Sequence, residues 1–367
     1  MMESRYEETE SILDLGFVES DVPAWKLASR FFHSKVGGFP PWLALEDIPT
    51  DLECGLCEQR LIFLLQIYAP IEDNNAAFHR SIYVFFCRNA SCHAAEGFDP
   101  TKVFRVYRSQ LPRANSYYPY DPPVEYPEWR IDLLQEKVLP LCRLCGAFSA
   151  TKSCSSCKKA KYCSKEHQTI DWKVGDHKSE CSNSEISLIS TYSSKFLIPE
   201  YELVMEADDE SVSEDEDSDD DNHEVNVDEE IAKAEALGDK ELSPEDLAKA
   251  VASDAHDDKI FNKFRKNVKV APDQVVRYSR GAEPLWISSE GRPSTIPDCP
   301  YCGSARKFEF QVMPQLLSSL KLDEGRIGEE SVDWGILGVY TCANSCSGGL
   351  KYKTEYLFRQ NPSSIKK

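Results

Sequence analysis

"CGLCEQRLIFLLQI" (Cys54–Ile67) and "CPYCGSARKFEFQV" (Cys299–Val312) are two versions of one phrase, 245 residues apart in a chain of 367. Each begins with a Cys-x2-Cys pair and continues into an apolar run typical of a β-strand. At this single offset, identical or similar residues stand at Cys54/Cys299, Cys57/Cys302, Phe63/Phe308, Gln66/Gln311 and Ile67/Val312. Such a repeat decides the fold, because it predicts that one structural unit occurs twice.

The repeated unit extends beyond this phrase in both directions. Upstream, "SKVGGFPPWL" and "SRGAEPLWI" share a Gly/Pro turn before a tryptophan, at Gly37/Gly281, Pro40/Pro284 and Trp42/Trp286. Downstream, "YVFFCRNASC" and "GVYTCANSC" each end in a second cysteine pair, Cys87/Cys92 and Cys342/Cys346. Four landmarks in one order predict an internal duplication. We place one half at 10–130 and the other, with the helices before it, at 243–362.

Both halves are rich in strand signals. The runs "RLIFLLQIYA", "SIYVFFC", "KFEFQV" and "WGILGVYTC" are apolar, β-branched and aromatic, whereas "PQLLSSLKL" predicts a short helix. Strands that are apolar on both faces are expected to be buried on both sides. We therefore expect an α+β, β-rich fold in which two homologous half-domains pack into one core, each sheet covering the edge or face of the other.

The charge of the chain is concentrated in one segment. The net charge is −20, and residues 206–230 hold 15 acidic residues without a lysine or arginine. Residues 206–240 are too charged to fold alone, so we predict a disordered acidic linker there. Ser213 and Ser218, each followed by acids, resemble acidophilic kinase sites. After the linker, Ser243 is the expected N-cap of a helix, and a second helix is expected over 257–270.

Composition also limits the class of protein and its partners. The N-terminus lacks the apolar run of a secretory signal, and no window is long and apolar enough for a membrane span. The chain has 14 cysteines, and its four Cys-x2-Cys pairs are typical of metal ligands in a reducing compartment. The acidic segment would repel phosphates, so we expect a basic protein as partner and no direct nucleic-acid binding. The expected protein is a monomer of the cytoplasm and nucleus.

The strongest chemical signal lies between the halves, in residues 142–181. Eight Cys and His residues occur within 40 residues, which suits two closed, structural zinc sites: Cys142, Cys145, Cys154, Cys157, Cys163, His167, His177 and Cys181. The last four form two i, i+4 pairs, each of which places both members on one helical face. So short a segment buries little apolar surface, and metal binding would supply about 10 kcal/mol of folding free energy per site.

Two further candidate zinc sites lie in the halves themselves. The first quartet would be Cys54, Cys57, Cys87 and Cys92, and the second Cys299, Cys302, Cys342 and Cys346, each closing a strand pair as in a zinc ribbon. His93 could replace Cys92 as a ligand. The alternative is that these residues are reduced thiols buried in the core.

The middle segment resembles the MYND-type zinc finger, notably in "YCSKEHQTIDWKVGDHKSEC". The resemblance implies interleaved ligands. Cys142, Cys145, Cys163 and His167 would hold one ion, and Cys154, Cys157, His177 and Cys181 the other. It also implies a site for proline-containing peptides at Gln168 and Trp172. The alternative for Trp172 is packing in the small core of the finger.

No catalytic constellation is recognisable in the sequence. It contains neither a Gly-rich phosphate loop nor G-x-S-x-G, and the histidines outside the finger fall into no hydrolase motif. Lys35, within the paired-glycine stretch, is expected to be a solvated lysine rather than a ligand contact. We therefore expect a protein that is not an enzyme.

Over residues 12–362 the chain resembles the programmed cell death protein 2 family. The phrases that carry the resemblance include "SKVGGFPPWL", "FHRSIYVFFC", "KIFNKFRKNV" and "FQVMPQLL". The resemblance implies a dedicated chaperone for one basic small-subunit ribosomal protein, the homologue of the bacterial protein named S-five, in small-subunit biogenesis. The competing hypothesis is an adaptor whose MYND finger recruits transcriptional or apoptotic regulators.

Overall fold

The structure is a computed structural model that describes residues 13–94, 99–133, 139–148, 150–183, 197–208, 259–322 and 331–361. Most of the predicted acidic linker, with Ser213 and Ser218, and the helix expected from Ser243 lie outside these ranges.

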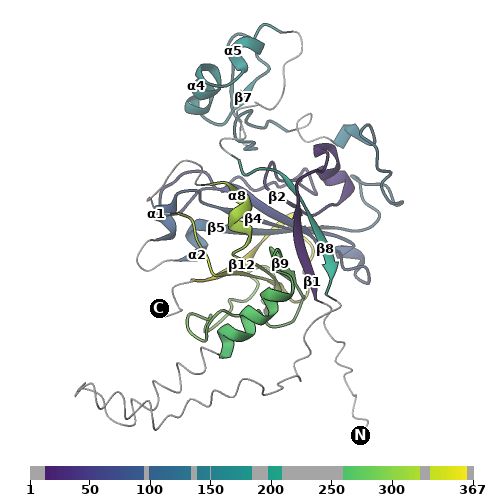
Figure 1. Cartoon of the computed structure of the whole chain (residues 1–367). Helices are drawn as coiled ribbons and strands as arrows, with labels where there is room; N and C mark the ends of the chain where they lie inside the picture. Colours follow the sequence, from purple (N-terminus) through teal and green to yellow (C-terminus); the bar gives the residue numbers. More distant parts are fainter. Residues whose placement is uncertain are drawn as a thin grey trace, which may run out of the picture.

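Ten antiparallel strands form one closed barrel (Figure 1). Around the barrel the strands are β1 (Asp14–Glu19), β8 (Tyr201–Ala207), β2 (Lys35–Val36), β3 (Ile62–Tyr68), β4 (His79–Phe86), β5 (Phe104–Leu111), β12 (Tyr352–Gln360), β11 (Ile336–Cys342), β10 (Arg306–Val312) and β9 (Val276–Tyr278), which pairs with β1. The fold is therefore β-rich, as expected. The sheets do not stack as separate layers, because they join edge to edge.

The central strands are buried on both faces. All eight residues of β4 and all seven of β11 are buried. This agrees with the apolar and aromatic character of β11 and of the second part of β4, whereas β4 begins with the buried polar residues His79, Arg80 and Ser81. The main apolar core extends through both parts of the barrel, from Trp42 and Phe85 to Phe310 and Trp334.

Two hairpins of the barrel have the same register. In β3–β4, Phe63 faces Phe85 and Leu65 faces Val84, so the pairing skips Leu64. In β10–β11, Phe308 faces Tyr340 and Phe310 faces Val339, so the pairing skips Glu309. Each hairpin thus carries a β-bulge at the same position of the repeated phrase.

The two groups of strands meet at two seams. On one side β5 pairs directly with β12, with Val106 facing Glu355. On the other side β1 and β8 lie between β9 and β2. The strand β8 has no counterpart in the repeated unit and includes the first two residues of the segment 206–240.

Short helices connect and cover the strands. They are η1 (Ala24–Leu27), η2 (Ser29–Phe31), η3 (Asn75–Ala77), α1 (Ala90–His93), α2 (Pro100–Val103), η4 (Ile131–Leu133) and α8 (Leu316–Leu320), and residues 259–270 are also helical. The helix at 259–270 packs Phe264 against Ile287, Met313 and Ile336. The helix predicted in "PQLLSSLKL" is confirmed as α8. Among the described helices, none has the length and apolarity that crossing a membrane requires.

The Cys/His-rich segment forms a small unit at one end of the molecule (Figure 1). It consists of β6 (Lys152–Ser153), β7 (Lys161–Tyr162), α4 (Lys165–Lys173) and α5 (His177–Glu180) around a core of its own. Gly146, at φ 68°, lies so close to Phe39 of the barrel that a Cβ atom would fall 1.7 Å from the phenyl ring. Only glycine fits this contact between finger and barrel.

Candidate metal centres

The structure gathers the Cys and His residues into four compact groups. Within each group the ligand atoms all lie within 4.8 Å of one another, and the groups are Cys54/Cys57/Cys87/Cys92, Cys142/Cys145/Cys163/His167, Cys154/Cys157/His177/Cys181 and Cys299/Cys302/Cys342/Cys346. These groups contain all 14 cysteines of the chain. They are the same four sets that the sequence suggested.

The first finger group has the spacing of a tetrahedral site. The Sγ atoms of Cys145 and Cys163 are 3.6 Å apart, and the Nδ1 atom of His167 lies 3.7 Å from Sγ of Cys142 and 3.3 Å from Sγ of Cys163. Zinc with Zn–S and Zn–N bonds of about 2.3 and 2.0 Å would place such atoms about 3.5 to 3.8 Å apart. A disulfide would need about 2.05 Å. The donor set therefore fits zinc.

The second finger group has similar dimensions. Sγ of Cys154 lies 3.8 Å from Sγ of Cys181, and Sγ of Cys157 lies 3.8 Å from Nε2 of His177. The two groups alternate along the chain, so each ion would tie the first part of the finger to its helices.

Local helix signals orient the ligands of the finger. Ser164 is the N-cap of α4, and its side chain accepts a hydrogen bond of 3.1 Å from the backbone N–H of His167. The cap fixes the first turn of α4 and so turns His167 toward Cys163, four residues earlier.

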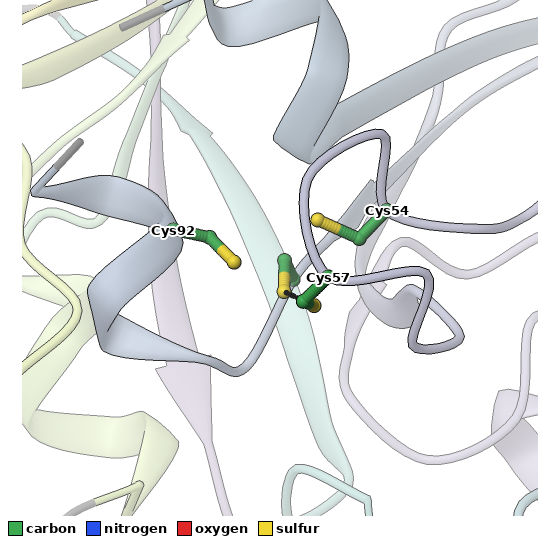
Figure 2. Close-up of side chains that lie close together, drawn as sticks. Cys54, Cys57 and Cys92 are labelled. Atoms are coloured by element: carbon green, nitrogen blue, oxygen red, sulfur yellow. Dashed lines mark hydrogen bonds between the residues drawn. The ribbon is translucent and has the colours of Figure 1, made fainter. Parts of the chain in front are cut away.

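The two groups in the barrel, here called the first core group (Cys54, Cys57, Cys87 and Cys92) and the second core group (Cys299, Cys302, Cys342 and Cys346), each lie at one end of a hairpin. Figure 2 shows Cys54, Cys57 and Cys92 pointing toward one another. Cys54 and Cys57 lie in the turn before β3, and Cys92 lies in α1. His93 does not replace Cys92 as a ligand. Its Nε2 atom instead lies 2.7 Å from the carbonyl oxygen of Cys87.

All four Cys-x2-Cys turns have one backbone conformation. The residue after the second cysteine has a positive φ in each turn: Glu58 (58°), Gly146 (68°), Lys158 (61°) and Gly303 (70°). The N–H of that residue donates to the carbonyl of the first cysteine at 2.8 to 3.0 Å. Non-glycine residues seldom adopt such φ values, so the turns at Glu58 and Lys158 are held against some strain.

Comparison with known proteins matches three regions of the chain. Residues 12–125 match the model "Programmed cell death protein 2, N-terminal domain", residues 258–361 match the corresponding "C-terminal putative domain", and residues 142–181 match the MYND finger. The programmed cell death protein 2 of Rattus norvegicus is 45% identical over 357 residues, which cover 95% of this chain and 96% of that protein. The chain belongs to the programmed cell death protein 2 family.

More distant members match over most of their length. The human "Programmed cell death protein 2-like" is 29% identical, covering 85% of each chain. A protein of Schizosaccharomyces pombe named "Probable 20S rRNA accumulation protein 4" is 24% identical, covering 85% of this chain and 87% of that protein. No solved structure matches.

The MYND finger also contains a buried arginine, Arg143, that contacts three acidic residues. The sequence had not indicated this cluster. Arg143, between two ligand cysteines, is 1% exposed and donates to Asp171 at 2.9 Å and to Asp176 at 2.8 Å, and it also contacts Glu180. Tyr162 donates to Asp171 at 2.8 Å. Arg143 thus ties the first Cys-x2-Cys turn to α4 and α5. An arginine between two ligands was visible in the sequence, but its acidic partners were not.

Several donors of these groups would keep their protons without a bound cation. Burial, followed by neighbouring thiols, raises the pKa of Cys92 to about 12 and that of Cys346 to about 12. The thiols of Cys142 and Cys163 raise the pKa of His167 to about 10. Four such donors cannot all lose their protons in one small volume unless a positive ion offsets the charge.

Trp172 is partly exposed, whereas Lys35 is buried. Trp172 is 40% exposed, with its ring centroid 5.7 Å from that of His177, so the ring packs against the finger on one side and is open to solvent on the other. Gln168 lies on the same helix and is half-buried. The expectation that Lys35 is solvated is wrong. Lys35 is 2% exposed and forms an ion pair with Glu200, and burial lowers its pKa.

Proposed function

We propose that this protein is a non-enzymatic, zinc-binding chaperone for a basic small-subunit ribosomal protein and acts in small-subunit biogenesis. The observation that carries the proposal is the relative named "Probable 20S rRNA accumulation protein 4", which the chain matches over 85% of its own length. The client we propose is the homologue of the bacterial protein named S-five.

The arrangement of the cysteines supports a role other than catalysis. All 14 lie in groups that fit structural metal sites, so none remains as a nucleophile. Two zinc ions in the finger, with the interleaved ligands described above, complete this proposal.

The matched hairpins support an internal duplication. Both carry a bulge at the same position of the repeated phrase, and both place a Cys-x2-Cys turn at the same end. We therefore propose that the barrel consists of two homologous halves, with the finger and the acidic linker inserted between them.

The acidic segment gives the proposed client its charge complement. Residues 206–230 carry 15 acidic residues, and a basic client would be attracted over about a Debye length, 8 to 10 Å at physiological salt. This fits a monomer of the cytoplasm and nucleus that binds protein rather than nucleic acid directly.

A second candidate function is an adaptor that binds proline-containing peptides. The 40% exposure of Trp172 favours it, because an exposed aromatic ring on a helix is a ready surface for proline.

Affinity purification of the tagged full chain separates these functions. The variants are Trp172→Ala, which removes the exposed ring, and Cys154→Ala, which removes one finger ligand. The chaperone hypothesis predicts that a small-subunit ribosomal protein co-purifies with both variants as with the wild type. Loss of that protein from both variants, with the barrel still folded by circular dichroism, would favour the adaptor.

The role of the acidic segment has a separate kinetic test. Replacing the acids of 206–230 by Asn and Gln should slow association with the purified client about tenfold at low salt, and the difference should vanish near 1 M salt. An unchanged rate at low salt would remove the segment from the proposal.

A further inference from the structure

The two cysteine groups of the barrel have the dimensions of zinc sites. Sγ of Cys57 lies 3.6 Å from Sγ of Cys87, Sγ of Cys299 lies 3.8 Å from Sγ of Cys346, and Sγ of Cys302 lies 3.5 Å from Sγ of Cys342. Four thiolates at about 2.3 Å from zinc would lie about 3.8 Å apart. These residues lie outside the region 142–181 that matches the MYND finger.

Arg108 forms hydrogen bonds to the loop of the second core group. Arg108 of β5 reaches the carbonyl oxygen of Cys346 with both Nη atoms, each at 3.4 Å. Gln110, two residues further on, donates to the carbonyl of Ser345 at 2.9 Å. Arg108 itself is fully buried and held by Glu355, at 2.7 Å from Nε. A side chain from the first group of strands thus fixes the loop that carries Cys342 and Cys346.

Arg359, from the other group of strands, forms a hydrogen bond next to the first core group. Arg359 of β12 donates to the carbonyl of His93 at 3.1 Å, and its Nη1 lies 3.5 Å from Nδ1 of that ring. The Nε2–H of His93 donates to the carbonyl oxygen of Cys87 at 2.7 Å. Arg359 thereby supports, through His93, the loop that carries Cys87 and Cys92.

Arg108 and Arg359 occupy equivalent places in the two hairpin systems. Tyr83 pairs with Tyr107, and Gly338, at the matching position of β11, pairs with Phe358. The arginines are the next residue in each last strand. Because β5 and β12 pair with each other, each arginine crosses the seam to the other group of strands. The contact is therefore reciprocal.

We propose that each cysteine group of the barrel holds one zinc ion, and that Arg108 and Arg359 each clamp the zinc loop of the opposite half. Zinc fixes each loop so that its carbonyl groups meet the arginine fork, and the arginine in turn holds the ligands in place. The two ions thus brace the β5–β12 seam. Arg108 and Arg359 are positioning residues, because they hold the backbone of the ligand loops. Arg108 in addition donates from Nη2 to Sγ of Cys346 at 3.7 Å. This inference does not depend on the identity of a client.

The metal content of the unaltered chain tests the first part. Native mass spectrometry of the wild type should show four zinc ions. X-ray absorption should show an average of about 3.5 sulfur and 0.5 nitrogen ligands per zinc, because the finger groups have three cysteines and one histidine and the barrel groups four cysteines. Two zinc ions with about three sulfur ligands and one nitrogen ligand each would overturn the proposal.

Cadmium substitution tests the clamp. In ¹¹³Cd spectra of the full chain, the two all-sulfur signals can be assigned with Cys302→Ser, which alters only the second barrel group. Arg108→Met should then shift the signal of the second group, and Arg359→Met that of the first. Metal release from the affected group to a chelator should become about 10 to 100 times faster.

Arg105→Met is the matched control for the clamp, because Arg105 lies on β5 but bonds to the nearby carbonyls of Thr101 and Phe104. It should leave both signals and both release rates unchanged. A different pattern would contradict reciprocal clamping: each arginine affecting the group of its own half, or neither group responding. Arg108→Lys keeps the charge without the fork and should restore only part of the retention.

Discussion

The hairpins β3–β4 and β10–β11 have the same pairing register but bury different side chains at the matching bulge. Leu64, in the first hairpin, is fully buried in the apolar core. Glu309, in the second, is equally buried but accepts two hydrogen bonds from Arg80, at 2.7 and 2.8 Å. Arg280 adds a third at 3.1 Å. Burial alone would raise the pKa of Glu309, but these arginines lower it to about 2. One backbone device thus serves an apolar contact and an ionic one.

The segments before these hairpins differ in a similar way. The backbone at Leu43 and Ala44 bonds to the hydroxyl groups of Tyr83, Tyr118 and Tyr352. The corresponding backbone around Leu285 and Ile287 bonds instead to the side-chain amides of Gln311 and Gln360. Both solutions satisfy buried polar groups. The two segments thus have buried backbone groups at matching places, but different side chains supply the partners.

The ionic bulge should be the more fragile of the two. Arg80→Met leaves the Glu309 carboxylate buried with one arginine fewer, and should lower the free energy of unfolding by about 3 to 5 kcal/mol. The double variant Arg80→Met with Glu309→Leu makes this bulge apolar, like the one at Leu64, and should recover much of the loss. Urea unfolding at fixed free zinc gives both values. A double variant as unstable as the single one would show that the two bulges are not interchangeable.

The tyrosine-supported segment should respond to the loss of one hydroxyl. The hydroxyl of Tyr83 accepts from the buried N–H of Leu43 at 2.8 Å and donates to the carbonyl of Pro41 at 3.0 Å. Tyr83→Phe removes both hydrogen bonds, so the free energy of unfolding should fall by about 2 kcal/mol. Tyr126→Phe, at a ring that is 45% exposed, is the control and should change stability little. Equal effects in the two variants would contradict a structural role for the hydroxyl.

The free energy of unfolding should also depend on pH through His79, which lies in the first half. Burial and then Arg113 lower the pKa of His79 to about 4, against about 6.5 when unfolded. The neutral ring in the folded state is favoured above pH 6.5, and this stability is lost as the pH falls from 6.5 toward 4. Between pH 7 and 5 the wild type should lose about 1 kcal/mol relative to His79→Phe, which keeps the stacking on Phe32. Parallel unfolding curves of the two proteins at pH 7 and pH 5 would contradict this assignment.

Much of the candidate site was predictable because metal-ligand spacing is a local property. The four Cys-x2-Cys pairs, the i, i+4 pairs and the strands beside them could be read directly, and the structure brings the same residues together. The arginine clamps could not be read in this way, although Arg108 and Arg359 follow matching strand positions. Their partners are backbone carbonyls on the other half, and sequence periodicity gives no information about such contacts.

The repeated phrase, the strand-rich character of both halves and the close Cys and His spacings could be read from the sequence, because each depends on residues close together in the chain or on a constant offset. The interleaved sets of the finger came instead from the resemblance to the MYND-type zinc finger. Only the folded chain shows that the sheets close into one barrel, that β8 enters it between β1 and β2, and that Lys35 is buried against Glu200. Strand order and buried charge pairs join residues far apart in the chain. They are stable only when the whole barrel supplies their partners and excludes water.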